Sequence, residues 1–235
     1  GNPFSVMPHR PNYAAFSFTD DPYHEAYVLG ESIKGEFLQH TEMEFQLSLK
    51  TPLIKDAFWG KADWYFAITT HAYWQIFNND ISEPFRETNY EPEMLLTFEN
   101  DWEVFGFKNV SNSIVFNHQS NGQPQLKSRS WNRIIAHFNF EKDNYFTAFK
   151  PWYRIPEDDK QNVLEKNGDD NPDIHQYLGY FDWLHVVSLG DTKLSLNLRN
   201  NLDLDKNRNT IDLTSRIQPR SASLGLRRFS VVIIT

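Results

Sequence analysis

The sequence contains no cysteine, so disulfide bonds and thiolate metal sites are excluded. It has no uninterrupted apolar run of about 18 residues, which excludes a transmembrane helix. Basic residues are outnumbered, 23 against 31 acidic residues, and the formal net charge of −8 argues against a nucleic-acid-binding protein. The Gly-x-Ser-x-Gly pattern of α/β-hydrolases is also missing. These absences do not exclude a transmembrane β-barrel, because its strands alternate apolar and polar residues and form no long apolar run.

Nothing in the chain separates two domains, because it has no Ser/Gly linker, no long charge run and no tandem helical repeat. We expect a single β-barrel domain over residues 1–235, with an N-terminal arm and first strand in 1–40 and an atypical tail in 212–235. The opening stretch "GNPFSVMPHRPNY" has neither a charged n-region nor an apolar h-region. A signal peptide is therefore expected to have been removed, or never to have existed.

Apolar residues recur at every second position, which is the pattern of β-strands. In "EFQLSLKTPL", Phe45, Leu47 and Leu49 alternate with polar residues. The run "DWYFAITTHAYWQIF" (63–77) exceeds the ~9–11 residues that a tilted strand needs to cross a bilayer. The aromatic content of 15% suits strands and a membrane interface better than a helical bundle. Soluble sandwiches and lipocalin-like barrels alternate as well, so this pattern alone leaves both classes open.

The segment 133–141 sorts its side chains by polarity onto two faces. One face carries Arg133, His137, Asn139 and Glu141, and the other carries Ile134, Ala136, Phe138 and Phe140. A charged face opposite an apolar one is typical of a barrel with a polar lumen and a lipid-facing exterior. The sequence therefore favours a transmembrane barrel.

Three polar residues continue the apolar faces of two adjacent strands in "NHQSNGQPQLKSRSWNR" (117–133). His118 and Ser120 share the face of Ile114 and Phe116, and Asn132 lies on the apolar side of its own strand. A serine hydrolase needs a base for the hydroxyl proton and a group that orients this base. Asparagine orients an imidazole without placing a charge beside hydrocarbon. From spacing alone, three interfacial hairpin residues remain the alternative.

Other polar groups give weaker indications. His71, His137, His175 and His185 lack the spacing of a metal site, so we expect none from histidine. The acidic stretch 156–173 is the obvious extended loop; it could bind calcium, although such loops are commonly just solvated.

Five motifs in this order resemble outer membrane phospholipase A of Gram-negative bacteria. They are "FRETNYEPE" (85–93), "NHQSNG" (117–122), "SRSWNR" (128–133), "KPWY" (150–153) and "DDNPDI" (169–174). The resemblance, from about Asn2 to about Leu198, implies a 12-stranded antiparallel transmembrane barrel in the outer membrane. It also implies calcium dependence, activation by homodimerisation, and hydrolysis of sn-1 and sn-2 acyl esters of phospholipids and lysophospholipids.

The resemblance assigns roles to individual residues. It makes Ser120 the nucleophile, His118 the general base and Asn132 the residue that orients the histidine. Two classes of alternative stay open beside this enzyme: a non-catalytic outer membrane barrel acting as pore or adhesin, and a soluble β-sandwich binding module.

The same resemblance implies four calcium ligands. Ser128 matches a ligand beside the nucleophile, and Ser82 matches the ligand that the partner subunit contributes across the dimer. Gln123 stands where the family often has arginine, and this position serves calcium through its backbone carbonyl. Asp170 matches a residue of a secondary calcium site.

The C-terminal stretch "QPRSASLGLRRFSVVIIT" departs from the family pattern. We count roughly ten strands against the family's twelve and expect no further strand–turn–strand pair here. The tail is expected to be a divergent strand or, as we favour, the result of truncation or an altered reading frame. An unclosed barrel would leave backbone groups unsatisfied in lipid, at several kcal/mol per group.

Overall fold

The structure is a computed structural model of the chain, and it describes residues 5–19, 38–81, 84–123, 127–162, 165, 168–203, 208–217 and 227–234. Its strands are β1 (Met7–Pro8), β2 (Tyr13–Phe18), β3 (Thr41–Asp56), β4 (Ala62–Trp74), β5 (Phe85–Glu99), β6 (Glu103–Val104), β7 (Phe107–Ser120), β8 (Ser130–Lys142), β9 (Tyr145–Ile155), β10 (Phe181–Leu189), β11 (Thr192–Asn200), β12 (Asn209–Ile217) and β13 (Arg227–Ile234). The helical segments are α2 (Ala57–Gly60), η1 (Asn79–Ile81) and α3 (Ile174–Leu178). In these residues no helix is long and apolar enough to cross a membrane.

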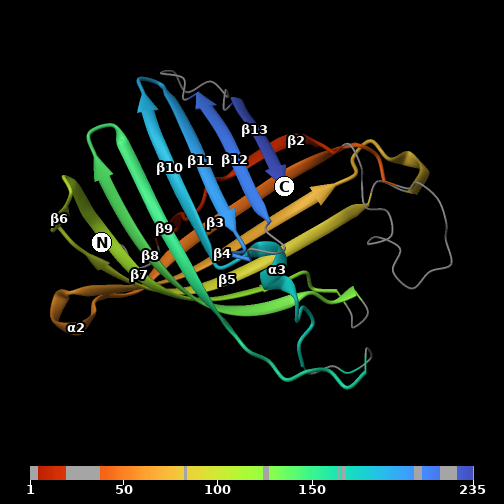
Figure 1. Cartoon of the computed structure of the whole chain (residues 1–235), viewed down its shortest axis with the longest axis horizontal. Helices are drawn as coiled ribbons and strands as arrows, with labels where there is room; N and C mark the ends of the chain where they lie inside the picture. The colour runs from red at the N-terminus through yellow and green to blue at the C-terminus, as the bar shows by residue number, and fades with distance from the viewer. Residues whose placement is uncertain are drawn as a thin grey trace.

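All strands belong to one antiparallel sheet of 13 strands that curls round as a half-barrel (Figure 1). Neighbours follow the order β1-β3-β4-β5-β7-β8-β9-β10-β11-β12-β13, while β2 pairs with β3 and β6 with β7. Sequential antiparallel neighbours are the arrangement of an up-and-down barrel. The expected all-β antiparallel fold is confirmed.

Tight turns join the strands at one end of the sheet. Lys142 and Tyr145 are register partners, so the β8–β9 turn has two residues, and its Asp143 has a positive φ of 53°. The β10–β11 turn is equally short and contains Gly190 with φ 59°. Positive φ at a central turn residue matches the twist of a two-residue hairpin. The described residues that follow β7, β9 and β11, which are 121–123, 156–162 and 201–203, therefore lie at the opposite end.

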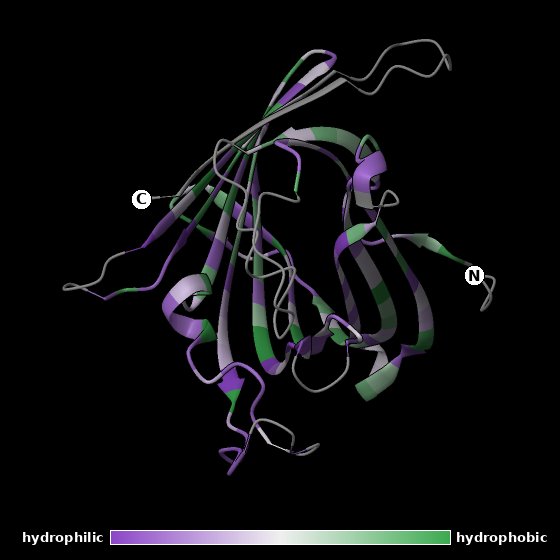
Figure 2. Ribbon diagram, turned by 90° about the vertical axis from the view of Figure 1, so that its right-hand side faces the viewer, coloured by the Kyte–Doolittle hydropathy of each residue, from purple (hydrophilic) through white to green (hydrophobic). Residues whose placement is uncertain are grey.

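Alternation along the strands separates an inner from an outer face, as the hydropathy colouring of Figure 2 illustrates. On β7 the side chains of Ile114 and Phe116 are 44% and 48% exposed, whereas Val115 between them is fully buried. On β8 Ile134 is 36% exposed and Arg133 only 6%. The polarity predicted for segment 133–141 thus agrees with the burial of Arg133 and the exposure of Ile134 and Phe138, whereas Glu141, near the end of the strand, is exposed.

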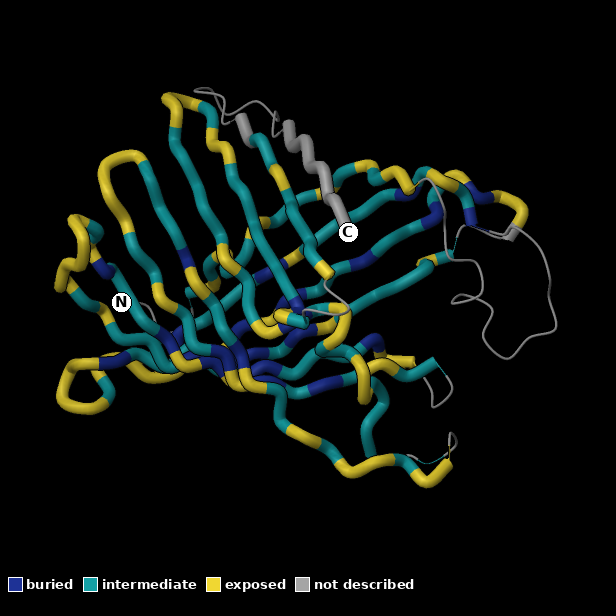
Figure 3. The backbone as a smooth tube through the Cα atoms, in the orientation of Figure 1, coloured by how far each residue is buried: buried dark blue, intermediate teal, exposed yellow. Residues whose placement is uncertain are grey.

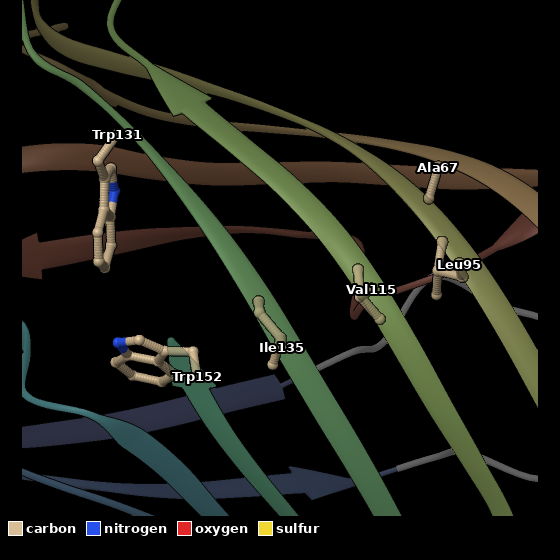
Figure 4. Packing of buried hydrophobic residues seen from close by; sticks show 6 residues of the cluster. All are labelled: Ala67, Leu95, Val115, Trp131, Ile135 and Trp152. Carbon is tan, nitrogen blue, oxygen red and sulfur yellow. The ribbon is translucent and has the colours of Figure 1, made fainter. Parts of the chain in front are cut away.

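The inner face combines a small apolar cluster with a polar network. Six buried residues from five strands form the cluster shown in Figure 4: Ala67, Leu95, Val115, Trp131, Ile135 and Trp152. Ile174 and Leu178 of α3 pack against it. This helix, which the sequence did not predict, closes the long-loop end of the inner face.

Several charged residues inside the sheet form a paired network. Arg10, from the segment after β1, lies 2.9 Å from both Glu91 and Glu93 of β5, and His9 lies 2.8 Å from Glu93. Asn117 donates to both carboxylates at 3.3 and 3.2 Å. Buried charges are tolerated only when paired and hydrogen-bonded, so this network ties the N-terminal segment to the centre of the sheet.

The C-terminal tail contains the strand β13, which agrees with the divergent strand that was one of the two expectations, whereas the count of roughly ten strands was too low. β12 spans Asn209–Ile217 and pairs with β13, Arg227–Ile234, over eight register partners. The reason lies in "RRFSVVII" and "NTIDLTSRI", whose β-branched and alternating residues favour extended backbone. Within the described residues, β13 pairs only with β12, and Figure 3 shows that β10 to β12 carry no buried residues.

Candidate active site

The site starts from the register of two neighbouring strands. His118 of β7 and Asn132 of β8 are direct cross-strand partners. Side chains opposite each other on one face have Cβ atoms about 5 Å apart. Here the ring Nδ1 of His118 and Oδ1 of Asn132 are 2.8 Å apart. An amide oxygen only accepts, so Nδ1 donates the hydrogen bond and Nε2 is left free for a second partner.

Ser120 lies on the same outer face as His118, two residues further along β7 and opposite Ser130. Its side chain is half-buried, and it ends the strand where the lipid-facing row of Ile114 and Phe116 stops. No hydrogen bond joins the Ser120 hydroxyl to the His118 ring in the described part of the chain. Catalytic hydrogen bonds are often long or poorly aligned without substrate and tighten when it binds.

The turn between β7 and β8 is organised by Asn121, which is 6% exposed. Its Nδ2 donates to the carbonyl of Lys127 at 2.8 Å, and its Oδ1 accepts from the backbone N–H of Arg129 at 2.9 Å. Gly122 follows with a φ of 66°, a conformation that glycine adopts without a steric penalty. This explains "SNG" in the motif "NHQSNG" (117–122): these residues shape the turn that carries Gln123 and Ser128.

Behind the pair, the inner face fixes both strands. Arg133 donates from Nε and Nη2 to the amide oxygen of Asn117 at 3.0 and 2.7 Å. Its guanidinium lies 4.0 Å from the ring centroid of Trp131, whose indole nitrogen donates to Gln119 at 2.9 Å. Asn117 and Gln119 flank His118 on β7, and Trp131 and Arg133 flank Asn132 on β8. The network on the inner face therefore fixes the backbone that carries His118 and Asn132 on the outer face.

The structure brings two of the predicted calcium ligands together. The Ser128 hydroxyl donates to Asp170 Oδ2 at 2.5 Å, and the Ser130 hydroxyl donates to the same oxygen at 3.1 Å. Lys160 forms an ion pair with the other carboxylate oxygen. Partial burial raises the pKa of Asp170, but the hydrogen bonds from Lys160, Ser128 and Ser130 outweigh it, and the pKa lies below its ordinary value.

The remaining predicted ligands are less defined. Gln123 is exposed, and its backbone N–H donates to Asn121 Oδ1 at 3.3 Å. Ser82 lies outside the described residues. Within those residues, no three histidine or acidic side chains gather as a metal site. The four histidines weighed above lie on β4, β8, α3 and β10.

The sequence did not point to Glu157. Its Oε1 accepts a hydrogen bond from Asn132 Nδ2 at 3.0 Å. The loop that carries it is tied down, because Arg154 forms a bidentate ion pair with Asp169 at 2.5 Å. Residues 156–173 were expected to be mostly solvated, and no local pattern reveals which carboxylates of an acidic loop fold back.

A curled antiparallel sheet with an apolar outer face and a paired polar interior is a β-barrel of the membrane type. What sets this one apart is the serine, histidine and asparagine at the end of its outer face, beside a turn rich in oxygen ligands.

Comparison with known proteins agrees with this class. The phospholipase A1 family model matches residues 1–226. Phospholipase A1 of Escherichia coli (strain K12) is 36% identical over 194 residues, which cover 83% of this chain and 63% of the relative. The enzyme of Klebsiella pneumoniae is 34% identical over 197 residues, covering 83% and 64%. The chain belongs to the phospholipase A1 family.

Solved structures give the same result. Outer membrane phospholipase A from Escherichia coli superimposes with a TM-score of 0.81 at 31% identity, covering 99% of this chain and 84% of that one. The Salmonella typhi outer membrane phospholipase, solved as a dimer with bound calcium, gives 0.80 at 30% identity, with the same coverage. The present chain spans about 63% of the length of the curated relatives it matches.

Proposed function

We propose that this protein is a calcium-dependent phospholipase of the Gram-negative outer membrane. It would hydrolyse sn-1 and sn-2 acyl esters of phospholipids and lysophospholipids through Ser120, His118 and Asn132. The observation that carries this proposal is the 2.8 Å contact between His118 Nδ1 and Asn132 Oδ1 on the outer face of the barrel. An uncharged orienting residue at the lipid boundary suits an enzyme whose substrate is the lipid, because it places no charge beside hydrocarbon.

The chemistry follows from the tautomer that Asn132 selects. Ser120 Oγ attacks the ester carbonyl while His118 Nε2 takes the hydroxyl proton. The ester C–O bond then breaks, and His118 returns the proton to the leaving alcohol oxygen. Water attacks the acyl-serine in turn, its proton passes through His118 to Ser120 Oγ, and the fatty acid leaves. Asn132 keeps Nδ1 as the donor throughout.

The donor set fits calcium, which prefers hard oxygen ligands in a flexible shell. Ser128 and Asp170 present hydroxyl and carboxylate oxygens in contact with each other. We propose that Ser128 Oγ, the Gln123 carbonyl and a Ser82 contributed across the dimer hold an ion near Ser120, with Asp170 serving a secondary site. When bound, the ion would stabilise the negative charge that develops on the ester oxygen.

Homodimerisation is part of the proposal, because Ser82 would reach the site from a second copy. The outer face supplies a contact surface: Leu47, Ile68, Phe66, Ile114 and Phe116 are each exposed by 37% to 54%. The Salmonella typhi relative has been solved as a calcium-bound dimer. Two such faces together would also enclose an acyl chain.

The pore or adhesin alternative has less support. Glu91, Glu93, Arg10 and Arg133 pair across the interior instead of lining an open channel with free charge. A soluble sandwich would have to cover the exposed apolar outer face.

An active-site sulfonyl fluoride tests the proposal directly. We expect it to modify Ser120 stoichiometrically in calcium-loaded detergent micelles, as measured by mass spectrometry of the peptide. Labelling should fall at least tenfold in His118→Ala, since the hydroxyl then lacks its base. Equal labelling of Ser120 and of Ser130, its register partner, would contradict an activated nucleophile.

A further inference from the structure

The backbone carries the loop after β9 directly past Asn132. Asn132 of β8 is the register partner of Ile155, the last residue of β9. Glu157 follows two residues later, and its Oε1 accepts a hydrogen bond from Asn132 Nδ2 at 3.0 Å. Asn132 therefore has one partner at each end of its amide, His118 at the oxygen and Glu157 at the nitrogen.

The loop is anchored on both sides of this contact. Arg154, at the end of β9, pairs with Asp169 and donates to the carbonyl of Pro172 at 3.2 Å. The backbone N–H of Asp169 donates to the carbonyl of Asp158 at 2.8 Å. The Glu157 side chain is half-buried beside these anchors. Its position is thus set by several interactions and not by the Asn132 contact alone.

The two ends of an asparagine amide have nearly the same shape, and only their hydrogen-bonding partners distinguish them. A flipped Asn132 would present its NH₂ group to His118 Nδ1. The ring would then carry its proton on Nε2 and could not accept the proton of Ser120. An ionised carboxylate can only accept a hydrogen bond. Glu157 therefore binds the Nδ2 group of Asn132 but would repel Oδ1 if the amide were flipped.

The Glu157 carboxylate also places a negative charge on the side of Asn132 that is opposite His118. As the Ser120 proton reaches His118, the ring becomes positive. A negative charge aligned behind the Asn132 dipole stabilises that cation, in the way that a carboxylate does in a charged triad. The charge sits on the aqueous loop and not beside the acyl chains, which avoids its desolvation.

We propose that Glu157 is a positioning residue that extends the Ser120–His118–Asn132 relay by one member and fixes the orientation of the Asn132 amide. This inference rests on the proposed function, because it requires His118 to act as the base. It adds a residue that could be assigned from the sequence only to an acidic loop and that acts through Asn132 without touching the lipid.

The first test is the Glu157→Gln variant, with Asp159→Asn as the matched control. Asp159 is an exposed carboxylate of the same loop, and in the described residues it has no contact with Asn132. Glutamine can donate as well as accept and no longer excludes the flipped amide. We expect kcat to fall about tenfold with KM unchanged, and Asp159→Asn to stay within about twofold. Loss of the negative charge should move the acid limb of the kcat/KM profile to lower pH.

A rescue experiment separates positioning from loop structure. Asn132→Asp places two carboxylates at a distance that disfavours both charges, so it should be severely impaired while Glu157 is present. In Asn132→Asp/Glu157→Gln the glutamine amide can donate to the new aspartate, and activity should rise at least fivefold over the single variant. A loop that served only structure would give no such recovery.

The outcomes distinguish a failure of this inference from a failure of the proposed function. Ser120→Ala, assayed in parallel, should be inactive; if it hydrolyses lipid, the proposed function fails. If Ser120→Ala is inactive but Glu157→Gln matches Asp159→Asn in kcat and pH profile, Glu157 has no role in the relay. A rise in KM alone, or equal activity of Asn132→Asp with and without Glu157, would also overturn it. A heat-modifiability gel confirms that each variant is folded.

Discussion

Arg133 should be the most costly single residue to remove from the inner face behind the site. Arg133→Met keeps the length of the side chain and most of its apolar volume but deletes the guanidinium. That group donates twice to Asn117 and lies 3.6 Å from Glu91, with a side chain only 7% exposed. It also lies over the rings of Trp131 and Trp152 at 4.0 and 5.2 Å.

The magnitude follows from these contacts. Hydrogen bonds from a charged donor contribute about 1.5–3 kcal/mol, and a desolvated cation–π contact adds about 1–2 kcal/mol. Glu91 keeps its ion pair with Arg10, which limits the loss. We expect the free energy of unfolding to fall by about 3 kcal/mol, which raises the unfolded fraction more than 100-fold.

Urea unfolding in detergent micelles, followed by tryptophan fluorescence, measures this change. Arg129→Met is the control, because the Arg129 side chain is exposed and, in the described structure, its guanidinium donates only to the carbonyl of Ser128. It should change the free energy of unfolding by less than about 0.5 kcal/mol. If the two variants lose equal stability, the inner network does not hold the strands as argued.

Two further predictions concern the loop beside the turn. Lys160→Met should lower the calcium concentration for half-maximal activity about three- to tenfold, because the ammonium group no longer pairs with Asp170; an unchanged calcium titration would contradict this competition. The contacts of Asp170 should persist well below neutral pH. Its pKa is lowered in the folded state from the ordinary 3.8, so its contribution is complete above that value and is lost as the pH falls through the lowered pKa. The protection factors for hydrogen exchange in the described residues of 156–173 should thus stay constant down to about pH 4. A fall in these factors between pH 7 and 5 would be the contrary result.

The faces of the central strands could be predicted from the sequence because side chains in a strand alternate strictly. This is why the outward placement of His118 and Asn132 agrees with the structure, and why Arg133 was expected inside. His118 and Ser120 lie two residues apart on β7, and Asn132 lies directly opposite His118 on β8. Both relations follow from local backbone geometry. The motif resemblance added roles that spacing could not give.

The rest depends on contacts between distant segments. Glu157 lies near Asn132 only because β9 ends in register with it, and Lys160 reaches Asp170 only because the loop folds back. Charge and composition are the same for a loop that folds back and for one that is solvated. Arg10 meets Glu91 and Glu93 across more than 80 positions of sequence, and no local pattern encodes that pairing. β12 and β13 were not counted from the sequence because each alternates over only nine or eight residues.

The central claim is that this barrel hydrolyses phospholipids with Ser120. The most direct measurement is fatty acid release from phospholipid in detergent micelles, with calcium and with chelator, for the unmodified protein and for Ser120→Ala. We predict that fatty acid release requires calcium and disappears in Ser120→Ala. A folded barrel that releases no fatty acid, or release that survives Ser120→Ala, would contradict it.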